Sequence, residues 1–97
     1  MDILRRTAAS LHRHLAPPLF VIEIRGGAAR TRRGDVPPAL VGGVSDVARD
    51  LGLRNGTVYG VRRAQGLSLS FSDDIPEHAH QRLRNVLATQ RQRIPGA

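Results

Sequence analysis

Residues 35–48 read DVPPALVGGVSDVA, and residues 74–87 read DIPEHAHQRLRNVL. Each stretch begins with Asp and a β-branched residue, continues with Pro, and then carries apolar residues at the spacing of an amphipathic helix. Asp74 follows Asp35 by 39 residues. The recurrence predicts two helices that start in the same way and bury similar stripes. The stripe residues are Leu40, Val44, Val47 and Leu51 in the first helix, and Ala79, Leu83, Val86 and Leu87 in the second.

Each predicted helix follows two segments with the alternating pattern of a strand. Residues 20–25 and 28–33 flank Gly26 and Gly27, a pair typical of a tight hairpin turn. Residues 57–63 and 67–72 flank a second turn. We therefore predict an α+β fold: a duplicated ββα unit forming a four-stranded antiparallel sheet with two helices on one face. At the offset of 39, the apolar residues of 67–72 align with outward residues of 28–33, so one hairpin requires a register shift or a bulge.

The N-terminal residues 1–16 carry a helical stripe of apolar side chains that includes Leu4, Leu11 and Leu15, and Pro17 and Pro18 end it. The predicted organisation is an amphipathic helix with a Pro linker over 1–18, the ββαββα domain over 19–90 and a tail over 91–97. No segment reaches the roughly 18 consecutive apolar residues of a membrane span, and charges interrupt any signal-peptide core. This helix either packs on its own domain or contacts a membrane or partner.

The composition is strongly basic. Among the 97 residues are 15 Arg and no Lys, the formal net charge is +7, and Cys is absent. The missing Cys excludes disulfides and thiolate chemistry. The positive charge favours nucleic acid, an anionic membrane surface or an acidic protein as the partner.

The best candidate site is the sheet face that the helices leave uncovered. By the predicted alternation this face carries four arginines that could fork to phosphates, together with Glu23, Ser68 and Ser70. The same alternation places the three aromatic residues mainly in the core, whereas nucleic-acid platforms usually stack bases on aromatic rings. A merely solvated charged face is the alternative. The candidate polyanion-binding residues are Arg25, Arg30, Arg32 and Arg62.

The sequence offers little for catalysis. His78 and His80 are two residues apart on a predicted helix, so their side chains diverge by about 200° and cannot readily share a metal. Asp73 and Asp74 are better explained as helix caps than as a catalytic pair. Gly42 and Gly43 fall inside a helix, where close packing against the sheet explains them. We expect no catalytic residues, no metal and no cofactor.

Two stretches together resemble a known family: PLFVIEIRGGAARTRRGDVPPAL and LSLSFSDDIPEHAHQRLRNVL, with IPEHAHQRLRNVL the closest match. They resemble the bacterial family of domain of unknown function 3634, over residues 19–87. The resemblance implies no assigned activity and no catalytic residues. It also implies an apolar N-terminal membrane anchor in many members, from which residues 1–16 depart because arginines interrupt them.

These observations predict a small non-enzymatic binding module that is cytoplasmic, with peripheral membrane association as the alternative. In the first version it binds nucleic acid, or an acidic protein, through the arginine-bearing sheet face. In the second it contacts a membrane or a protein through Leu4, Leu11 and Leu15. The sequence leaves the oligomeric state open.

Overall fold

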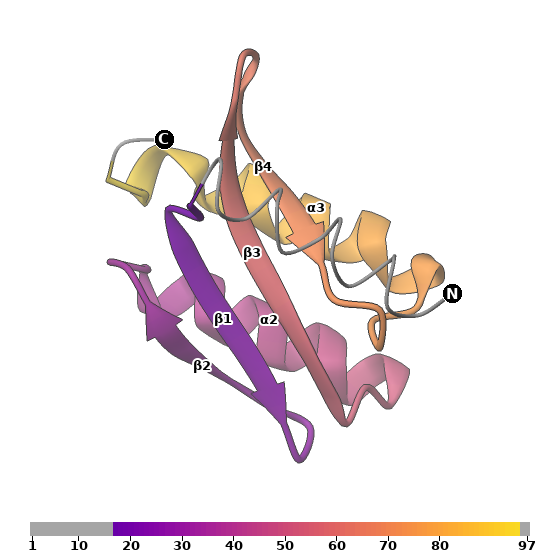
Figure 1. The fold of residues 1–97 in the computed structure, drawn as a ribbon. Helices are drawn as coiled ribbons and strands as arrows, with labels where there is room; N and C mark the ends of the chain where they lie inside the picture. Colours follow the sequence, from indigo (N-terminus) through magenta and orange to yellow (C-terminus); the bar gives the residue numbers. More distant parts are fainter. Residues whose placement is uncertain (1–16, 96–97) are drawn as a thin grey trace.

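The computed structural model describes residues 17–95, which form one sheet and two long helices (Figure 1). The elements follow the order strand, strand, helix twice, and a short 3₁₀ helix follows the second long helix. The α+β architecture predicted from the sequence is confirmed. The bounds are β1 Phe20–Arg25, β2 Ala28–Arg33, α2 Pro38–Leu51, β3 Asn55–Arg63, β4 Gly66–Phe71, α3 Glu77–Gln90 and η1 Arg91–Arg93.

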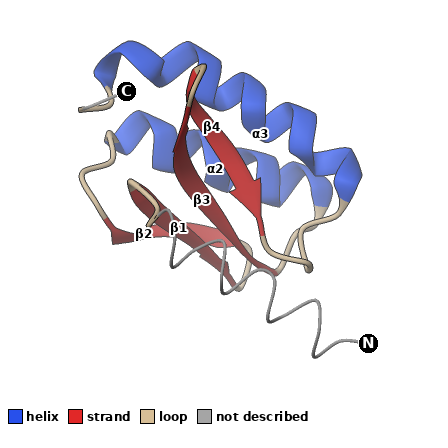
Figure 2. Ribbon diagram, turned by 45° about the horizontal axis from the view of Figure 1, so that its top comes forward, coloured by secondary structure: helices blue, strands red, loops and turns tan. Residues whose placement is uncertain are grey.

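The four strands form a fully antiparallel sheet in the order β2-β1-β3-β4, with both helices packed on the same face (Figure 2). β1 and β3 are therefore central, and β2 and β4 are the edges. The pairing of β1 with β2 is irregular between Val21 and Ile22, where Val21 lies opposite Arg33 and Ile22 opposite Thr31. This irregularity does not account for the mismatch between residues 28–33 and 67–72, because Ala28 and Arg30 lie nearer the turn and are already on the outward side.

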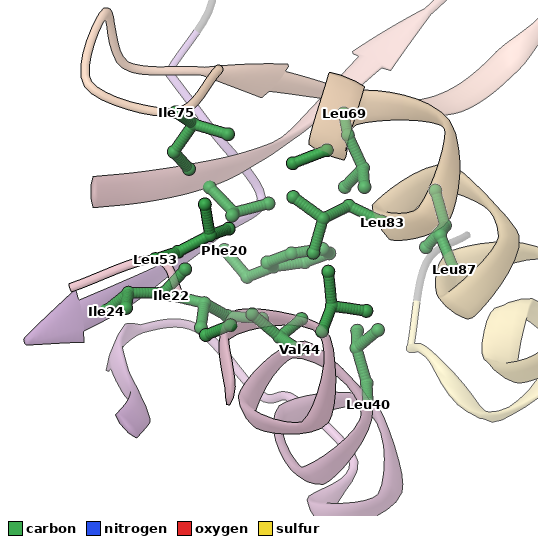
Figure 3. Close-up of a cluster of buried hydrophobic side chains, with 14 of the residues drawn as sticks. Phe20, Ile22, Ile24, Leu40, Val44, Leu53, Leu69, Ile75, Leu83 and Leu87 are labelled. Atoms are coloured by element: carbon green, nitrogen blue, oxygen red, sulfur yellow. The ribbon is translucent and has the colours of Figure 1, made fainter. Parts of the chain in front are cut away.

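The hydrophobic core lies between the sheet and the helices (Figure 3). Phe20, Ile22 and Ile24 of β1 point into it and are at most 1% exposed. They meet buried residues of α2 and α3, including Val44 and Leu83. Because every second residue of a strand faces the same way, β1 presents these three apolar residues to the helices and Val21, Glu23 and Arg25 to the other side.

Proline starts both helices. Pro37 is the N-cap of α2 and Pro76 is the N-cap of α3, and neither cap is completed by a side-chain hydrogen bond. The interpretation of Asp73 and Asp74 as helix caps is therefore wrong, because Asp74 instead accepts a hydrogen bond from the Ser72 hydroxyl. Helix α2 ends at Gly52, which has the left-handed conformation (φ 68°) that favours glycine at a helix end.

The offset of 39 residues holds for the helices but not for the strands. α2 and α3 begin and end at positions 39 apart. In the strands the same offset pairs Phe20, which is in the core, with Tyr59, which lies on the opposite face. The sequence-based placement of Tyr59 in the core is therefore wrong. Val58 and Gly60 face the helices instead, one residue out of phase with the predicted repeat.

The two consecutive glycines of α2 have different surroundings. A Cβ on Gly43 would lie 2.5 Å from Cγ1 of Val86, whereas one on Gly42 would have no heavy atom within 4 Å. The close approach at Gly43 is thus to α3, and not to the sheet as the sequence suggested. A side chain at this position would hold the two helices apart.

Alanine at these two positions should change stability in opposite directions. Gly42→Ala should raise the free energy of unfolding by about 0.5–1 kcal/mol, because alanine restricts the unfolded chain and favours the helix. Gly43→Ala should lower it by about 1–2 kcal/mol, because Val86 is β-branched and cannot easily turn away. Urea unfolding followed by circular dichroism measures both. Equal effects at the two positions would contradict this account.

The predicted N-terminal helix, with Leu4, Leu11 and Leu15, lies outside the described residues. Among residues 17–95, no helix combines the length and the apolar composition that crossing a membrane would need. The predicted C-terminal tail begins with η1, and Ile94 after it is buried against the core.

Candidate functional site

The sheet has an outer face, turned away from α2 and α3, and strand register decides which side chains it carries. Residues directly opposite one another in an antiparallel pair share a face. Glu23 of β1 lies between Arg30 of β2 and Thr57 of β3, and Val21 lies opposite Tyr59, which in turn lies opposite Ser70. The outer face therefore comprises Val21, Glu23, Arg25, Ala28, Arg30, Arg32, Arg33, Asn55, Thr57, Tyr59, Val61, Arg63, Ser68 and Ser70.

Three of these arginines surround one carboxylate on the β1–β2 half of the outer face. Arg25 Nη2 lies 3.4 Å and Arg32 Nη1 lies 3.7 Å from the carboxylate of Glu23, and Arg30 is the direct cross-strand neighbour of that residue. We call Arg25, Arg30, Arg32 and Glu23 the arginine cluster. It carries a net charge of +2, because a single carboxylate faces three guanidinium groups.

The arginines of the cluster are accessible, whereas the carboxylate is not. The side chains of Arg25 and Arg32 are 70% and 55% exposed, but that of Glu23 is 20% exposed. Its Oε1 atom is shielded from solvent and accepts no hydrogen bond. The ion pairs are long, so each guanidinium keeps donors directed to solvent. The cluster can therefore bind an anion without first losing a strong internal pair.

Arg62 does not belong to this site. It lies opposite Leu67, a buried core residue, so its side chain starts from the helix-bearing face of the sheet. The sequence-based assignment of Arg62 to the uncovered face is wrong because β3 is one residue out of phase with the predicted alternation. Arg63 occupies the outer face instead, where its Nε donates to the Ser68 hydroxyl. The bulge also brings Arg33 opposite Val21, which alternation alone could not show.

The centre of the outer face is less exposed than its β2 side. Tyr59 and Val21 are half-buried, and Val61 is only 5% exposed. Arg30 and Arg33 of the edge strand β2 are exposed. The charged, accessible part of the face is therefore the β1–β2 hairpin rather than the middle of the sheet.

Of the two histidines of α3, His80 packs against neighbouring residues and His78 is exposed to solvent. The His80 ring stacks on Phe71 with a centroid separation of 4.1 Å, and its Nε2 lies 3.2 Å from the carbonyl oxygen of Ile75. His78 is exposed at the first turn of the helix. Within the part of the chain that the structure describes, no three His, Cys, Asp or Glu side chains come close enough to hold a metal ion.

A hollow of about 420 Å³ lies beside the β1–β2 turn and the end of α2. Its potential nucleophile is the hydroxyl of Ser45, which already accepts a hydrogen bond from the Ala29 amide. Arg49 and Arg54 line its wall, and Arg49 is paired with Asp46. This hollow offers cations to a small anion but no acid or base beside the hydroxyl.

The fold and the cluster define a small basic α+β domain. The chain matches the family model described as protein of unknown function (DUF3634) over residues 9–95, and it therefore belongs to that family. No curated protein and no solved structure matches it. The family named from the two sequence stretches is thus confirmed.

Proposed function

We propose that this domain is a non-enzymatic module that binds the phosphate backbone of a nucleic acid through the arginine cluster. The observation that supports the proposal most directly is the placement of Arg25, Arg30 and Arg32 on one accessible face with only Glu23 among them. Guanidinium groups pair with phosphate oxygens through two parallel hydrogen bonds, which a flat sheet surface leaves free to form.

The spacing of the arginines fits the row of phosphates in a nucleic-acid backbone better than it fits a single anion. Alternate residues of a strand lie about 6.6 Å apart, so their side chains can engage different phosphates along an extended nucleic-acid strand. Arg30 and Arg32 are alternate residues of β2, and Arg33 extends the row. A nucleic-acid strand laid along this edge would therefore meet several cations in a row.

Two features limit base recognition. Tyr59, the one aromatic ring on the outer face, is half-buried near its centre and away from β2. The side chains within the cluster are charged and flexible. We therefore propose binding with little sequence preference, dominated by phosphate contacts and strongly dependent on salt.

The test is a titration of the full chain with a fluorescent single-stranded oligonucleotide across a salt series. Each phosphate contact to a single strand contributes about 0.7 to the slope of log affinity against log salt. Replacing both Arg30 and Arg32 by Gln should therefore weaken binding at low salt and reduce the slope by about 1.4. Replacing Glu23 by Gln should strengthen binding, because it removes the only negative charge of the cluster.

The matched control replaces Arg49 and Arg82 together by Gln, because these are exposed arginines on α2 and α3, on the other side of the sheet. It removes the same charge and should leave the slope unchanged. An equal loss in the control and the Arg30 and Arg32 variant would show that only net charge matters and would refute the assignment to the cluster. Binding of heparin without binding of the oligonucleotide would identify a different polyanion.

The alternative of a membrane or partner contact through residues 1–16 is tested in the same titration. A chain that starts at Pro17 should keep its nucleic-acid binding if the cluster carries it. Loss of binding to anionic vesicles on this truncation, with oligonucleotide binding absent throughout, would favour the N-terminal segment instead.

We also propose that the two ββα halves arose by duplication. The support is the recurrence of the element order, of the Pro-started helices at an offset of 39, and of a positive φ at Gly27 and Gly66. The strands differ in phase by one residue, because equivalent hairpin positions such as Arg25 and Arg63 lie 38 and not 39 residues apart.

A further inference from the structure

We propose that the β4 edge of the sheet binds an extended acidic segment of a partner protein as an additional strand. The proposal concerns the opposite edge from the arginine cluster and does not depend on nucleic-acid binding. It rests on three features of the described chain: an unprotected edge, backbone groups that point away from β3, and cations that line the edge.

The two edges of the sheet differ in how they resist pairing with another strand. β2 carries Arg30, Arg32 and Arg33 and a pairing irregularity near its end. Charges and bulges are the usual means by which proteins blunt an edge strand. The other edge, β4, reads GLSLSF, with no charge, no proline and a regular register to β3. Of the two, β4 is therefore the edge that can accept a further strand.

The hydrogen bonds show which backbone groups of β4 point outward. The Ser72 amide donates to the Thr57 carbonyl of β3, so the residues in phase with Ser72 bond to β3. Those out of phase with it, namely Leu67, Leu69 and Phe71, direct their N–H and C=O groups away from the sheet. The Leu67 carbonyl accepts a hydrogen bond from Arg91 Nη2, which confirms that it points outward. The outward groups of Leu69 and Phe71 remain for an incoming strand.

Cations line this edge. Arg91 reaches the Leu67 carbonyl, and the guanidinium carbon of Arg84 lies 5.4 Å from the Phe71 ring centroid. On the outer face, Arg63 of β3 is hydrogen-bonded to Ser68 of β4. Carboxylates on an added strand could therefore pair with arginines above and below the sheet, which favours an acidic partner.

The same charges argue against a second copy of this chain as the partner. Pairing β4 with β4 of another copy would bring together two sets of Arg84 and Arg91, with like charges opposed across a new interface. The N-terminal segment of the chain is also disfavoured, because residues 1–16 are rich in Arg and His and contain one acidic residue, Asp2.

The experiment uses the intact chain and a synthetic peptide of alternating Glu and Val, with amide hydrogen exchange read residue by residue. On binding, exchange of the Leu69 and Phe71 amides should slow by about tenfold or more, because they become hydrogen-bonded to the peptide. The Ser68 and Ser70 amides bond to β3 and should be protected with or without the peptide. A Lys and Val peptide, and a Glu and Val peptide interrupted by Pro, should give no protection.

Charge reversal supplies the second arm. Arg84→Glu should lower the affinity for the Glu and Val peptide by about tenfold. Arg49→Glu, on α2, makes the same change of charge far from β4 and should leave the affinity unchanged. Absence of binding would overturn the proposal, and so would binding that leaves the Leu69 and Phe71 amides unprotected. Protection that appears without peptide and grows with protein concentration would identify a second copy as the occupant and overturn the acidic partner.

Discussion

Replacing Gly60 by alanine is expected to lower the free energy of unfolding by about 3 kcal/mol. Gly60 lies in the central strand β3 directly opposite Phe20, and its missing side chain leaves the space that the phenylalanine ring occupies. A Cβ at this position would lie 2.2 Å from Cε2 and 2.4 Å from Cζ of Phe20. One of the two side chains would have to move.

The ring of Phe20 has nowhere to go. It is 0% exposed and sits among the side chains that join the sheet to both helices (Figure 3). Interiors are packed densely enough that one extra methyl group forces strained rotamers or a shift of backbone. Small domains are stable by only about 5–15 kcal/mol, so this loss would remove a large share of the total.

A double-mutant cycle tests whether the clash with Phe20 is the cause. Phe20→Leu alone should destabilise by creating space, and in its presence Gly60→Ala should cost at least about 1 kcal/mol less than in the natural chain. Urea unfolding followed by circular dichroism gives the four stabilities, with an unchanged denaturant slope as the sign of two-state unfolding. Additive losses would mean that Gly60 matters for another reason.

Replacing Gly34 by alanine is the second change with a large expected effect, again about 3 kcal/mol. Two costs combine at this position. Gly34 has φ +87°, a conformation that residues with a Cβ rarely adopt. Its Cβ would also lie 2.4 Å from the Leu19 carbonyl oxygen and 2.9 Å from Cα of Phe20. These are backbone atoms, and the Leu19 amide is held by a hydrogen bond to the Gly60 carbonyl.

Gly26→Ala is the matched control that separates the two costs. Gly26 also has a positive φ, +62°, but a Cβ there would meet no heavy atom within 4 Å. Its replacement should therefore lower the free energy of unfolding by about 1 kcal/mol, which is the cost of the backbone conformation alone. The difference between the two variants, measured in urea, is the contribution of the contact at Gly34. Equal losses would show that backbone conformation alone accounts for both.

These glycines illustrate what can be predicted from a sequence and what cannot. Gly26 and Gly27 form the predicted turn, and Gly52 ends the predicted helix, because tight turns and helix ends demand positive φ locally. Gly60 and Gly43 are needed because of side chains far away in the chain, Phe20 and Val86. No pattern around either glycine identifies its partner.

The arginines of the candidate site also differ in how well the sequence predicts the face on which they lie. The alternation in residues 20–25 places Arg25 on the uncovered face, and the tight turn at Gly26 and Gly27 then sets Arg30 and Arg32 on that same face. Arg62 was misplaced because residues 57–63, TVYGVRR, carry apolar side chains on both faces of the strand. Alternation then fails to say which face is inside, and a shift of one residue exchanges Arg62 for Arg63.

The sequence by itself determined the order of elements, both Pro-started helices, the Gly-Gly hairpin and the basic character of the domain. These depend on backbone preferences and periodicities that act over a few residues. Only the tertiary structure decided which face of β3 is buried, where the β1–β2 bulge falls, and which glycines contact other elements. Those outcomes depend on packing between segments distant in the chain, where the ring of Phe20 needs a neighbour without a side chain and Gly60 provides it.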